Sequence, residues 1–190
     1  MKNIVLFGPP GAGKGTQADF LKTLYHLIHI STGDVFRNNI KGNTALGLLA
    51  KSYMDKGDLV PDKVTIDMLK DEVDKHPHAK GFIFDGFPRT SSQATALDNF
   101  LNAKGTPISA MIALEVPEQL LVERLLKRGL TSGRPDDQDE SKIRNRFNEY
   151  ETKTAILVDY YSAQHKFIGI NGVGSIEEIT DRLRKAIDSL

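Results

Sequence analysis

The sequence contains no cysteine. This absence excludes disulfide bonds and any zinc site built on thiolates, and it is typical of a protein from a reducing cytosol. The 25 Lys and Arg residues balance 25 Asp and Glu residues, so the formal net charge is zero. No global positive field therefore draws in nucleic acid or an anionic membrane, and an anionic ligand must be recognised by local clusters of charge.

Long hydrophobic runs are also missing. The apolar segment near the N-terminus, NIVLF at 3–7, is too short for a signal peptide or a membrane helix and is better explained as a buried strand. There is no low-complexity tract, long linker or internal repeat. We therefore expect a cytoplasmic protein with one domain over residues 1–190, which is enough chain for a sizeable core.

Short apolar runs alternate with segments of helical pattern. Because such alternation is typical of a parallel sheet covered on both faces, we expect an α/β fold. The predicted strands are 3–7, 27–31, 82–85, 110–116 and 167–171. Helices are predicted after the glycine-rich loop, over 117–127 and over 139–163, and from Ser175, which has capping-box spacing to Glu178.

Two stretches interrupt this alternation. Residues 31–60 contain two short predicted helices, 33–40 and 44–56, which is more chain than one crossover between strands needs. The segment RGLTSGRPDD at 128–137 is rich in Gly, Ser and Pro and is predicted to be a loop between helices. Long loops inside a compact domain are often binding loops or lids.

The segment GPPGAGKGT at 8–16 follows the first predicted strand. Its glycines let the backbone N–H groups surround an anion, and Lys14 supplies a positive charge for phosphate. Gly15 stands where Ser or Thr usually binds magnesium, and Thr16 comes one place later. The alternative, a glycine-rich turn with a solvated lysine, is disfavoured because strand, loop and lysine occur in the order of a phosphate site.

Asp85 ends the predicted strand 82–85. A carboxylate at this place in P-loop proteins orients magnesium, so the metal would be held by nucleotide phosphates and by waters bound to Asp85. The alternative is a turn residue before Gly86.

Arginine is concentrated late in the chain, and Arg37 and Arg89 lie beside other candidate segments. Guanidinium groups match phosphate oxygens and stay charged. The alternative is ion pairing on helix surfaces with nearby Asp and Glu, which we favour for Arg144 but not for Arg134. The clustered arginines are Arg124, Arg128, Arg134, Arg144 and Arg146.

Several candidates have structural explanations. Asp34 lies three residues after Ser31 and can complete a helix start, and Thr90 and Gln93 have the same spacing. Gln93 is as consistent with capping as with contacting a base. His29 lies in an apolar strand and is best explained as a core residue, while Met54 is consistent with either core or pocket wall.

Taken together, the motifs resemble the adenylate kinase family over essentially the whole chain. GPPGAGKGTQ at 8–17, STGD at 31–34, GDLVPD at 57–62, DGFPRT at 85–90 and SGRPDD at 132–137 match that family's pattern in order. The resemblance implies a P-loop three-layer fold with a five-stranded parallel sheet, and the reaction ATP + AMP ⇌ 2 ADP with Mg²⁺. It also implies an AMP-binding flap at 31–60 and a lid at 128–138.

The resemblance assigns roles by position. Lys14, Arg89, Arg134 and Arg146 would act on the transferring phosphoryl group, and Asp85 would hold Mg²⁺ through water. ATP would contact Gly11, Ala12, Gly13, Lys14, Gly15, Thr16, Arg124, Arg128 and Gly174. AMP would contact Thr32, Arg37, Asp58, Leu59, Val60, Gly86, Phe87, Pro88, Arg89, Gln93, Arg134 and Arg146.

The lid is of the short type, because SGRPDD follows Arg128 almost at once. Without cysteine the zinc cluster of long lids is not expected. The expected partners are ATP, AMP and ADP, with no nucleic acid and no membrane, and we expect a monomer. Alternatives are a kinase for UMP, CMP or GMP, a nucleotide-dependent switch, and a nucleic-acid-binding module. The DGFPR segment and the arginines favour a transferase over the switch, and zero net charge argues against the last.

Overall fold

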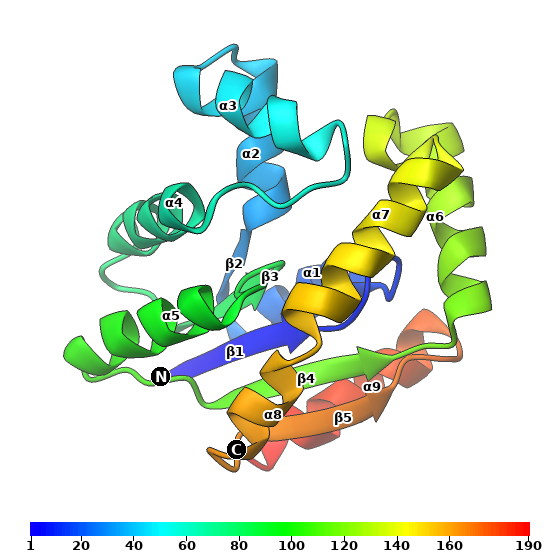
Figure 1. The fold of residues 1–190 in the computed structure, drawn as a ribbon. Helices are drawn as coiled ribbons and strands as arrows, with labels where there is room; N and C mark the ends of the chain where they lie inside the picture. Colours follow the sequence, from blue (N-terminus) through cyan, green and yellow to red (C-terminus); the bar gives the residue numbers. More distant parts are fainter.

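In a computed structural model that describes all residues 1–190, five parallel strands form one sheet (Figure 1). The spatial order is β2-β3-β1-β4-β5, so the chain crosses the sheet and the predicted α/β fold is confirmed. The strands are β1 (Lys2–Phe7), β2 (Ile28–Ser31), β3 (Gly81–Asp85), β4 (Ala110–Glu115) and β5 (Phe167–Asn171).

Helices cover both faces of the sheet, as the apolar runs require. In β1, Ile4 and Leu6 belong to a core shared with α1 and α9, whereas Val5 and Phe7 belong to a second core shared with α4, α5 and α8. Successive strand residues point to opposite faces, so a strand buried on both sides must be apolar throughout. The helices named here are α1 (Lys14–Tyr25), α4 (Asp62–Asp74), α5 (Ser91–Ala103), α8 (Leu157–Ser162) and α9 (Ile176–Asp188).

Two helical segments rise from the sheet on either side of its carboxyl end (Figure 1). One is the 31–60 segment, with α2 (Thr32–Lys41) and α3 (Ala45–Met54), and its Phe36 and Ala50 form a small core together with Met68 of α4. The other contains α6 (Glu118–Ser132), a 3₁₀ turn at Pro135–Asp137 and α7 (Glu140–Glu149), and we call it the lid segment. None of the helices combines the length and the apolar character that a membrane span requires.

Two predicted boundaries are wrong. The helix predicted over 139–163 is interrupted, because a π-helical turn at Tyr150–Thr154 separates α7 from α8. The helix predicted to end at 127 continues through Ser132, so part of the predicted 128–137 loop is helical. Gly129 is tolerated inside α6 and packs so closely on the 3₁₀ turn that a Cβ there would lie 2.4 Å from Asp137 O. Gly133, at φ 64°, is the left-handed residue that ends the helix.

Candidate active site

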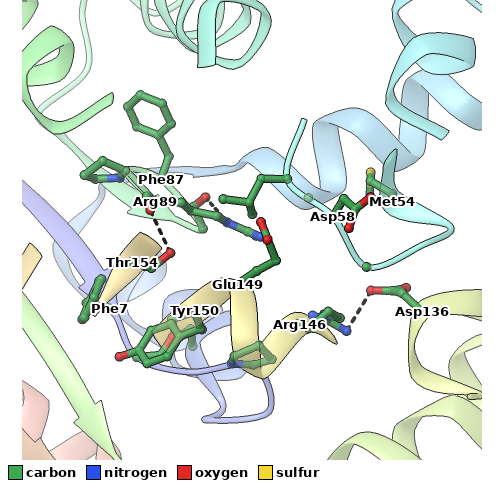
Figure 2. A pocket seen from close by; sticks show the side chains of 18 of the residues that line it. Phe7, Met54, Asp58, Phe87, Arg89, Asp136, Arg146, Glu149, Tyr150 and Thr154 are labelled. Atoms are coloured by element: carbon green, nitrogen blue, oxygen red, sulfur yellow. Dashed lines mark hydrogen bonds and ion pairs between the residues drawn. The ribbon is translucent and has the colours of Figure 1, made fainter. Parts of the chain in front are cut away.

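A cleft of about 110 Å³ opens at the carboxyl ends of the strands, between the two raised segments (Figure 2). Parallel sheets place their ligand sites at this edge, where the strand order changes direction. A smaller recess of about 40 Å³ lies on the side of α2 and shares Gly86, Arg89 and Leu59 with the main cleft. The predicted residues Lys14, Arg37, Asp58, Leu59, Phe87, Pro88 and Arg146 line the cleft, and Thr32, Val60 and Gln93 line the recess.

The glycine-rich loop joins β1 to α1 and lies under the cleft. Gly11 has φ 85°, and a Cβ there would lie 2.9 Å from Leu121 O, so both the backbone conformation and the packing require glycine. Lys14 begins α1, and its ammonium donates to Gly8 O at 2.7 Å and to Pro9 O at 3.0 Å. Burial lowers the pKa of Lys14 to about 8 although the nearby Asp85 raises it. A polyanion in the loop would restore the charged form.

Asp85 ends β3 beside this loop. A Cβ on Gly15 would lie 3.7 Å from Asp85 Oδ2, so the residue after the lysine faces the carboxylate directly. Nε2 of the largely buried His29 lies 3.6 Å from the same oxygen and has no hydrogen-bond partner. Burial alone would raise the pKa of Asp85, but the His29 imidazole and the Lys14 ammonium lower it, and the carboxylate stays charged.

The segment Gly86–Arg89 forms the wall between cleft and recess. Gly86, at φ 74°, is approached so closely that a Cβ would lie 2.9 Å from Arg89 Nη2 and 3.0 Å from Thr32 Oγ1. Gly86 O accepts from Thr32 Oγ1 at 2.9 Å and from Arg89 Nε at 2.7 Å. Burial and the charge of Arg146 lower the pKa of Arg89 to about 10. Arg89 therefore points positive charge into the cleft without a carboxylate partner.

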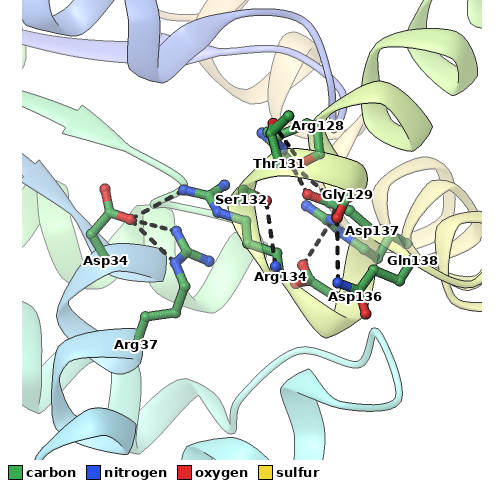
Figure 3. A network of polar contacts seen from close by, with 11 residues as sticks. Asp34, Arg37, Arg128, Gly129, Thr131, Ser132, Arg134, Asp136, Asp137 and Gln138 are labelled. Atoms are coloured by element: carbon green, nitrogen blue, oxygen red, sulfur yellow. Dashed lines mark hydrogen bonds and ion pairs between the residues drawn. The ribbon is translucent and has the colours of Figure 1, made fainter.

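The arginines of the lid segment are paired differently (Figure 3). Arg128 on α6 donates to both oxygens of Asp137, at 2.7 and 3.0 Å. Arg146 on α7 contacts Asp136 at 2.8 Å and Asp137 at 2.5 Å. Burial alone would raise the pKa of Asp137, but the Arg128 hydrogen bonds and the charge of Arg146 lower it. The ion pairing that we favoured for Arg144 is present, since Arg144 meets Glu140 at 2.7 Å, and Arg128 and Arg146 are paired as well.

Arg134 reaches across from the lid segment toward α2. Its Nη2 lies 3.5 Å from Asp34 Oδ1, while Arg37 binds the same oxygen at 2.6 Å (Figure 3). Burial and the charge of Arg37 lower the pKa of Arg134. Two guanidinium groups therefore share one carboxylate, and the contact of Arg134 is the longer of the two.

The other residues predicted to bind ATP are not among those that line the cleft. Arg124 Nη2 donates to Gly172 O at 3.4 Å, which brings α6 next to the turn that contains Gly174. Ala12, Gly13 and Thr16 lie in or just after the glycine-rich loop without lining the cleft.

Residues 6–166, which include the glycine-rich loop, the Gly86–Arg89 segment and the arginines of α6 and α7, match the family model described as adenylate kinase. The chain belongs to the adenylate kinase family. It is 64% identical to an adenylate kinase of Flavobacterium psychrophilum and 60% identical to one of Flavobacterium johnsoniae, each over 190 residues and the full length of both chains. An adenylate kinase of Parabacteroides distasonis is 50% identical over the same span.

Adenylate kinases are nucleotide-dependent phosphotransferases, and the family binds ATP, AMP and ADP. Phosphoryl transfer needs alignment and positive charge around the transferring group and little covalent chemistry from the protein. The cleft of this adenylate kinase family member offers such charge from three directions, through Lys14, Arg89 and Arg146. The structure contains no cluster of three His, Asp or Glu side chains placed to hold a metal ion.

Several lining residues carried no usable sequence signal. Glu149 at the end of α7 and Tyr150 and Thr154 of the π-helical turn line the cleft, and Thr154 Oγ1 donates to Arg89 O at 2.8 Å (Figure 2). Asn145 donates to Asp58 Oδ1 at 2.8 Å and so joins α7 to the 31–60 segment. The position of Met54, left open between core and pocket wall, is in the lining.

Proposed function

We propose that this chain catalyses the reversible reaction ATP + AMP ⇌ 2 ADP in the cleft between the two raised segments. The observation that supports this most directly is that the glycine-rich loop and the Gly86–Arg89 segment open onto one cleft. A phosphate-binding loop on one side and a second nucleotide recess on the other suit a transfer between two nucleotides. A switch that only hydrolyses its nucleotide has no use for the second recess.

The ATP phosphates would lie in the glycine-rich loop. Gly11 to Thr16 would offer backbone N–H groups and the N-terminal end of α1, and Lys14 would contact the β and γ phosphates. Arg128 would approach the phosphates from α6. Arg124 and the backbone at Gly174 would flank the adenine, because α6 and the turn after β5 already lie together there.

AMP would occupy the recess and the adjoining part of the cleft. Arg37 and Arg89 would bind its phosphate, and its base would lie near Thr32, Gln93 and the backbone of Asp58 to Val60. Gly86 to Pro88 would form the wall. Arg134 and Arg146 would then reach the transferring group from the lid, and the phosphate oxygen of AMP would attack without any protein nucleophile.

Residues 31–60 and 128–138 would act as two flaps that close over the nucleotides and exclude water. The 31–60 segment contributes Arg37 to the cleft, and Arg134 of the 128–138 segment lies 3.5 Å from Asp34 on the opposite flap. We also propose that the chain works as a monomer.

Magnesium fits beside Asp85. This carboxylate is charged, lies next to the phosphate loop and has Gly15 rather than a larger side chain facing it. Asp85 would hold the ion's water shell, and the ion would neutralise charge on the transferring phosphates. Asp85→Asn is expected to raise the magnesium concentration for half-maximal rate about tenfold, because an amide offers no negative charge. An unchanged magnesium titration in a folded variant would indicate that Asp85 is only a turn residue before Gly86.

The deciding experiment uses purified protein, ADP and Mg²⁺ with no second enzyme. We expect ATP and AMP to form together in equal amounts. A parallel assay offers ATP with AMP, UMP, CMP, GMP or no acceptor. Strong ATP hydrolysis without transfer to AMP would favour the switch, and preferred transfer to another monophosphate would replace AMP as the acceptor.

A further inference from the structure

The side-chain amide of Gln93 is held in one orientation at the recess. Gln93 lies in the first turn of α5 and is 1% exposed. Its Oε1 accepts from the backbone N–H of Arg89 at 2.8 Å, and its Nε2 donates to Asp62 Oδ1 at 2.8 Å. A backbone N–H only donates and a carboxylate only accepts. If the amide rotated by half a turn, its NH₂ group would face the N–H of Arg89 and its oxygen would face the carboxylate of Asp62. Both contacts would be unfavourable, so the orientation is fixed.

Asp62 is itself positioned by the helix that carries Gln93. Its second oxygen, Oδ2, accepts from Thr90 Oγ1 at 2.8 Å, and Thr90 Oγ1 accepts from the backbone N–H of Gln93 at 3.2 Å. An acidic residue in the first turn of a helix is commonly explained by the helix dipole. That explanation does not require either oxygen to contact another helix. Here both oxygens bind side chains around the start of α5, so Asp62 acts on Gln93.

The fixed amide still has capacity for a ligand. A glutamine amide has two N–H donors and two lone pairs on its oxygen, and one of each is used by Asp62 and Arg89. One N–H and one lone pair remain at a residue that lines the recess beside Thr32, Phe36 and Val60. The oxygen and nitrogen of an amide are bonded to the same carbon, so one donor and one acceptor can pair with two adjacent positions on the edge of a base.

Purines divide into two classes at the edge formed by positions 1 and 6. In a 6-aminopurine, N1 accepts a hydrogen bond and the 6-amino group donates one. In a 6-oxopurine, N1–H donates and O6 accepts, so the pattern is reversed. A freely rotating amide could pair with either class, whereas an amide with a fixed orientation pairs with one class and opposes like groups in the other.

We propose that Asp62 is a specificity-determining residue that fixes the Gln93 amide, so that the recess accepts a 6-aminopurine monophosphate and rejects its 6-oxo counterpart. This inference rests on the proposed function, which places the base of AMP in the recess. Asp62 is a positioning residue, since it acts through Gln93 and need not touch the nucleotide. The backbone N–H of Arg89 supplies the other half of the constraint and cannot be removed by a side-chain substitution.

The test compares AMP with inosine monophosphate, which differs at positions 1 and 6 but adds no 2-amino group. In Asp62→Asn the side chain keeps its shape, but it can turn either its oxygen or its amino group toward Gln93. We expect the ratio of kcat/KM for AMP to that for inosine monophosphate to fall about tenfold, since a paired base edge discriminates by about this factor or more. The KM for ATP and the Tm should change little.

Asp67→Asn is the matched control, because Asp67 is also on α4 but is exposed and pairs with Lys63 at 2.8 Å. It should leave the ratio unchanged. Gln93→Ala should lower the ratio by itself, and adding Asp62→Asn to it should lower the ratio no further, because the two residues act as one unit. Asp62→Ser provides a second test of the same position if the asparagine variant does not fold.

An equal loss for both monophosphates in Asp62→Asn, with an unchanged ratio, would make Asp62 a purely structural residue and overturn the inference. The inference is also overturned if the wild-type protein does not discriminate between the two monophosphates. If the wild-type protein transfers no phosphate to AMP, the proposed function itself fails and the inference fails with it. These outcomes separate the two claims, because the inference can fail while transfer to AMP stands.

Discussion

The positively charged side chains beneath the cleft hydrogen-bond to backbone carbonyls, whereas the arginines above it pair with carboxylates. Lys14 and Arg89, beneath the cleft, donate to backbone carbonyls of Gly8, Pro9 and Gly86. Arg128 and Arg146, in the lid segment, bind the carboxylates of Asp136 and Asp137. We call the first pair the floor cations and the second pair the lid arginines.

This difference indicates where a nucleotide would add the most favourable interaction. Burial lowers the pKa of Lys14 to about 8 and of Arg89 to about 10, so the floor cations are less favourable in the folded protein than in water. Phosphate would relieve that cost without breaking an ion pair. At the lid arginines the phosphate must compete with Asp136 and Asp137. The floor is therefore expected to supply most of the binding, and the lid to respond after the nucleotide is bound.

The largest expected effect comes from removing a floor cation. Lys14→Met keeps a chain of similar length but removes the charge, and we expect kcat to fall by about 10³-fold or more, within the range for removal of a charged group at a transferring phosphoryl. The Tm should stay the same or rise, because a buried ammonium is removed. Steady-state kinetics and thermal melts would measure both.

Lys63→Met is the control, since Lys63 is exposed and pairs only with Asp67. Near-normal kcat in Lys14→Met would place Lys14 outside the chemistry.

The next effect concerns Arg134, which belongs to neither group. Its only ion pair is the 3.5 Å contact with Asp34, an oxygen already bound by Arg37, so it is easily released. Lysine keeps the charge but loses the planar fork. We expect Arg134→Lys to lower kcat by at least about 10²-fold, with little change in ATP dissociation constant or Tm. Arg144→Lys, at an exposed pair with Glu140, should have no such effect.

If Arg134→Lys retains kcat or loses mainly ATP affinity, Arg134 is a binding or surface residue. Arg146 would then be the better candidate for stabilising the transferring group.

The structure of the cleft floor can be predicted from local sequence more completely than that of the lid segment. The apolar run of β1, the glycines that follow it and Lys14 are contiguous, so their spacing alone predicts strand, loop and helix. Asp85 is equally local, because it ends an apolar run. All five predicted strands agree with the structure within one residue at each end, and the three central strands β1, β3 and β4 are almost entirely buried, which explains their continuous apolar runs.

The lid depends on contacts that spacing does not encode. In α6, which continues to Ser132, Gly129 packs closely on Asp137, a contact that spacing does not reveal. The π-helical turn at Tyr150–Thr154 has no distinguishing composition. The sequence predicted arginines and acids near each other but not which would pair. The hydrogen bonds of Asp62 to Thr90 and Gln93 join residues 28 and 31 positions apart, so no local pattern reveals them.

Breaking a buried ion pair of the lid segment should destabilise the protein more than breaking an exposed one. Asp137 is fully buried and binds both lid arginines, so Asp137→Asn is expected to lower the free energy of unfolding by about 2 kcal/mol. This loss in free energy of unfolding is smaller than that for a fully buried ion pair because the Arg128 side chain is 35% exposed. Glu140→Gln, which breaks the exposed pair with Arg144, should lower it by about 0.5 kcal/mol or less. Urea unfolding would measure both, and equal losses would contradict a special role for Asp137.

The smallest expected effect is a proton bound together with the nucleotide. With the pKa of Lys14 near 8, the ligand-free protein is mostly neutral at Lys14 at pH 9. Polyphosphate favours the ammonium, so binding at pH 9 should take up about 0.9 proton if the pKa returns to its ordinary value, and far less at pH 7.5. Calorimetry of ATP binding in buffers with different ionisation enthalpies would count the protons. Lys14→Met should abolish the uptake.

The sign of this linkage also fixes the pH dependence of stability. Between about pH 8 and 10.5 the unfolded chain binds a proton at Lys14 that the folded, ligand-free protein does not. The contribution of Lys14 to the free energy of unfolding therefore becomes less unfavourable as pH rises through this window. Bound ATP should remove that trend, because it raises the folded-state pKa. Uptake of equal size in Lys14→Met would assign the proton to another group and weaken the contrast between floor cations and lid arginines.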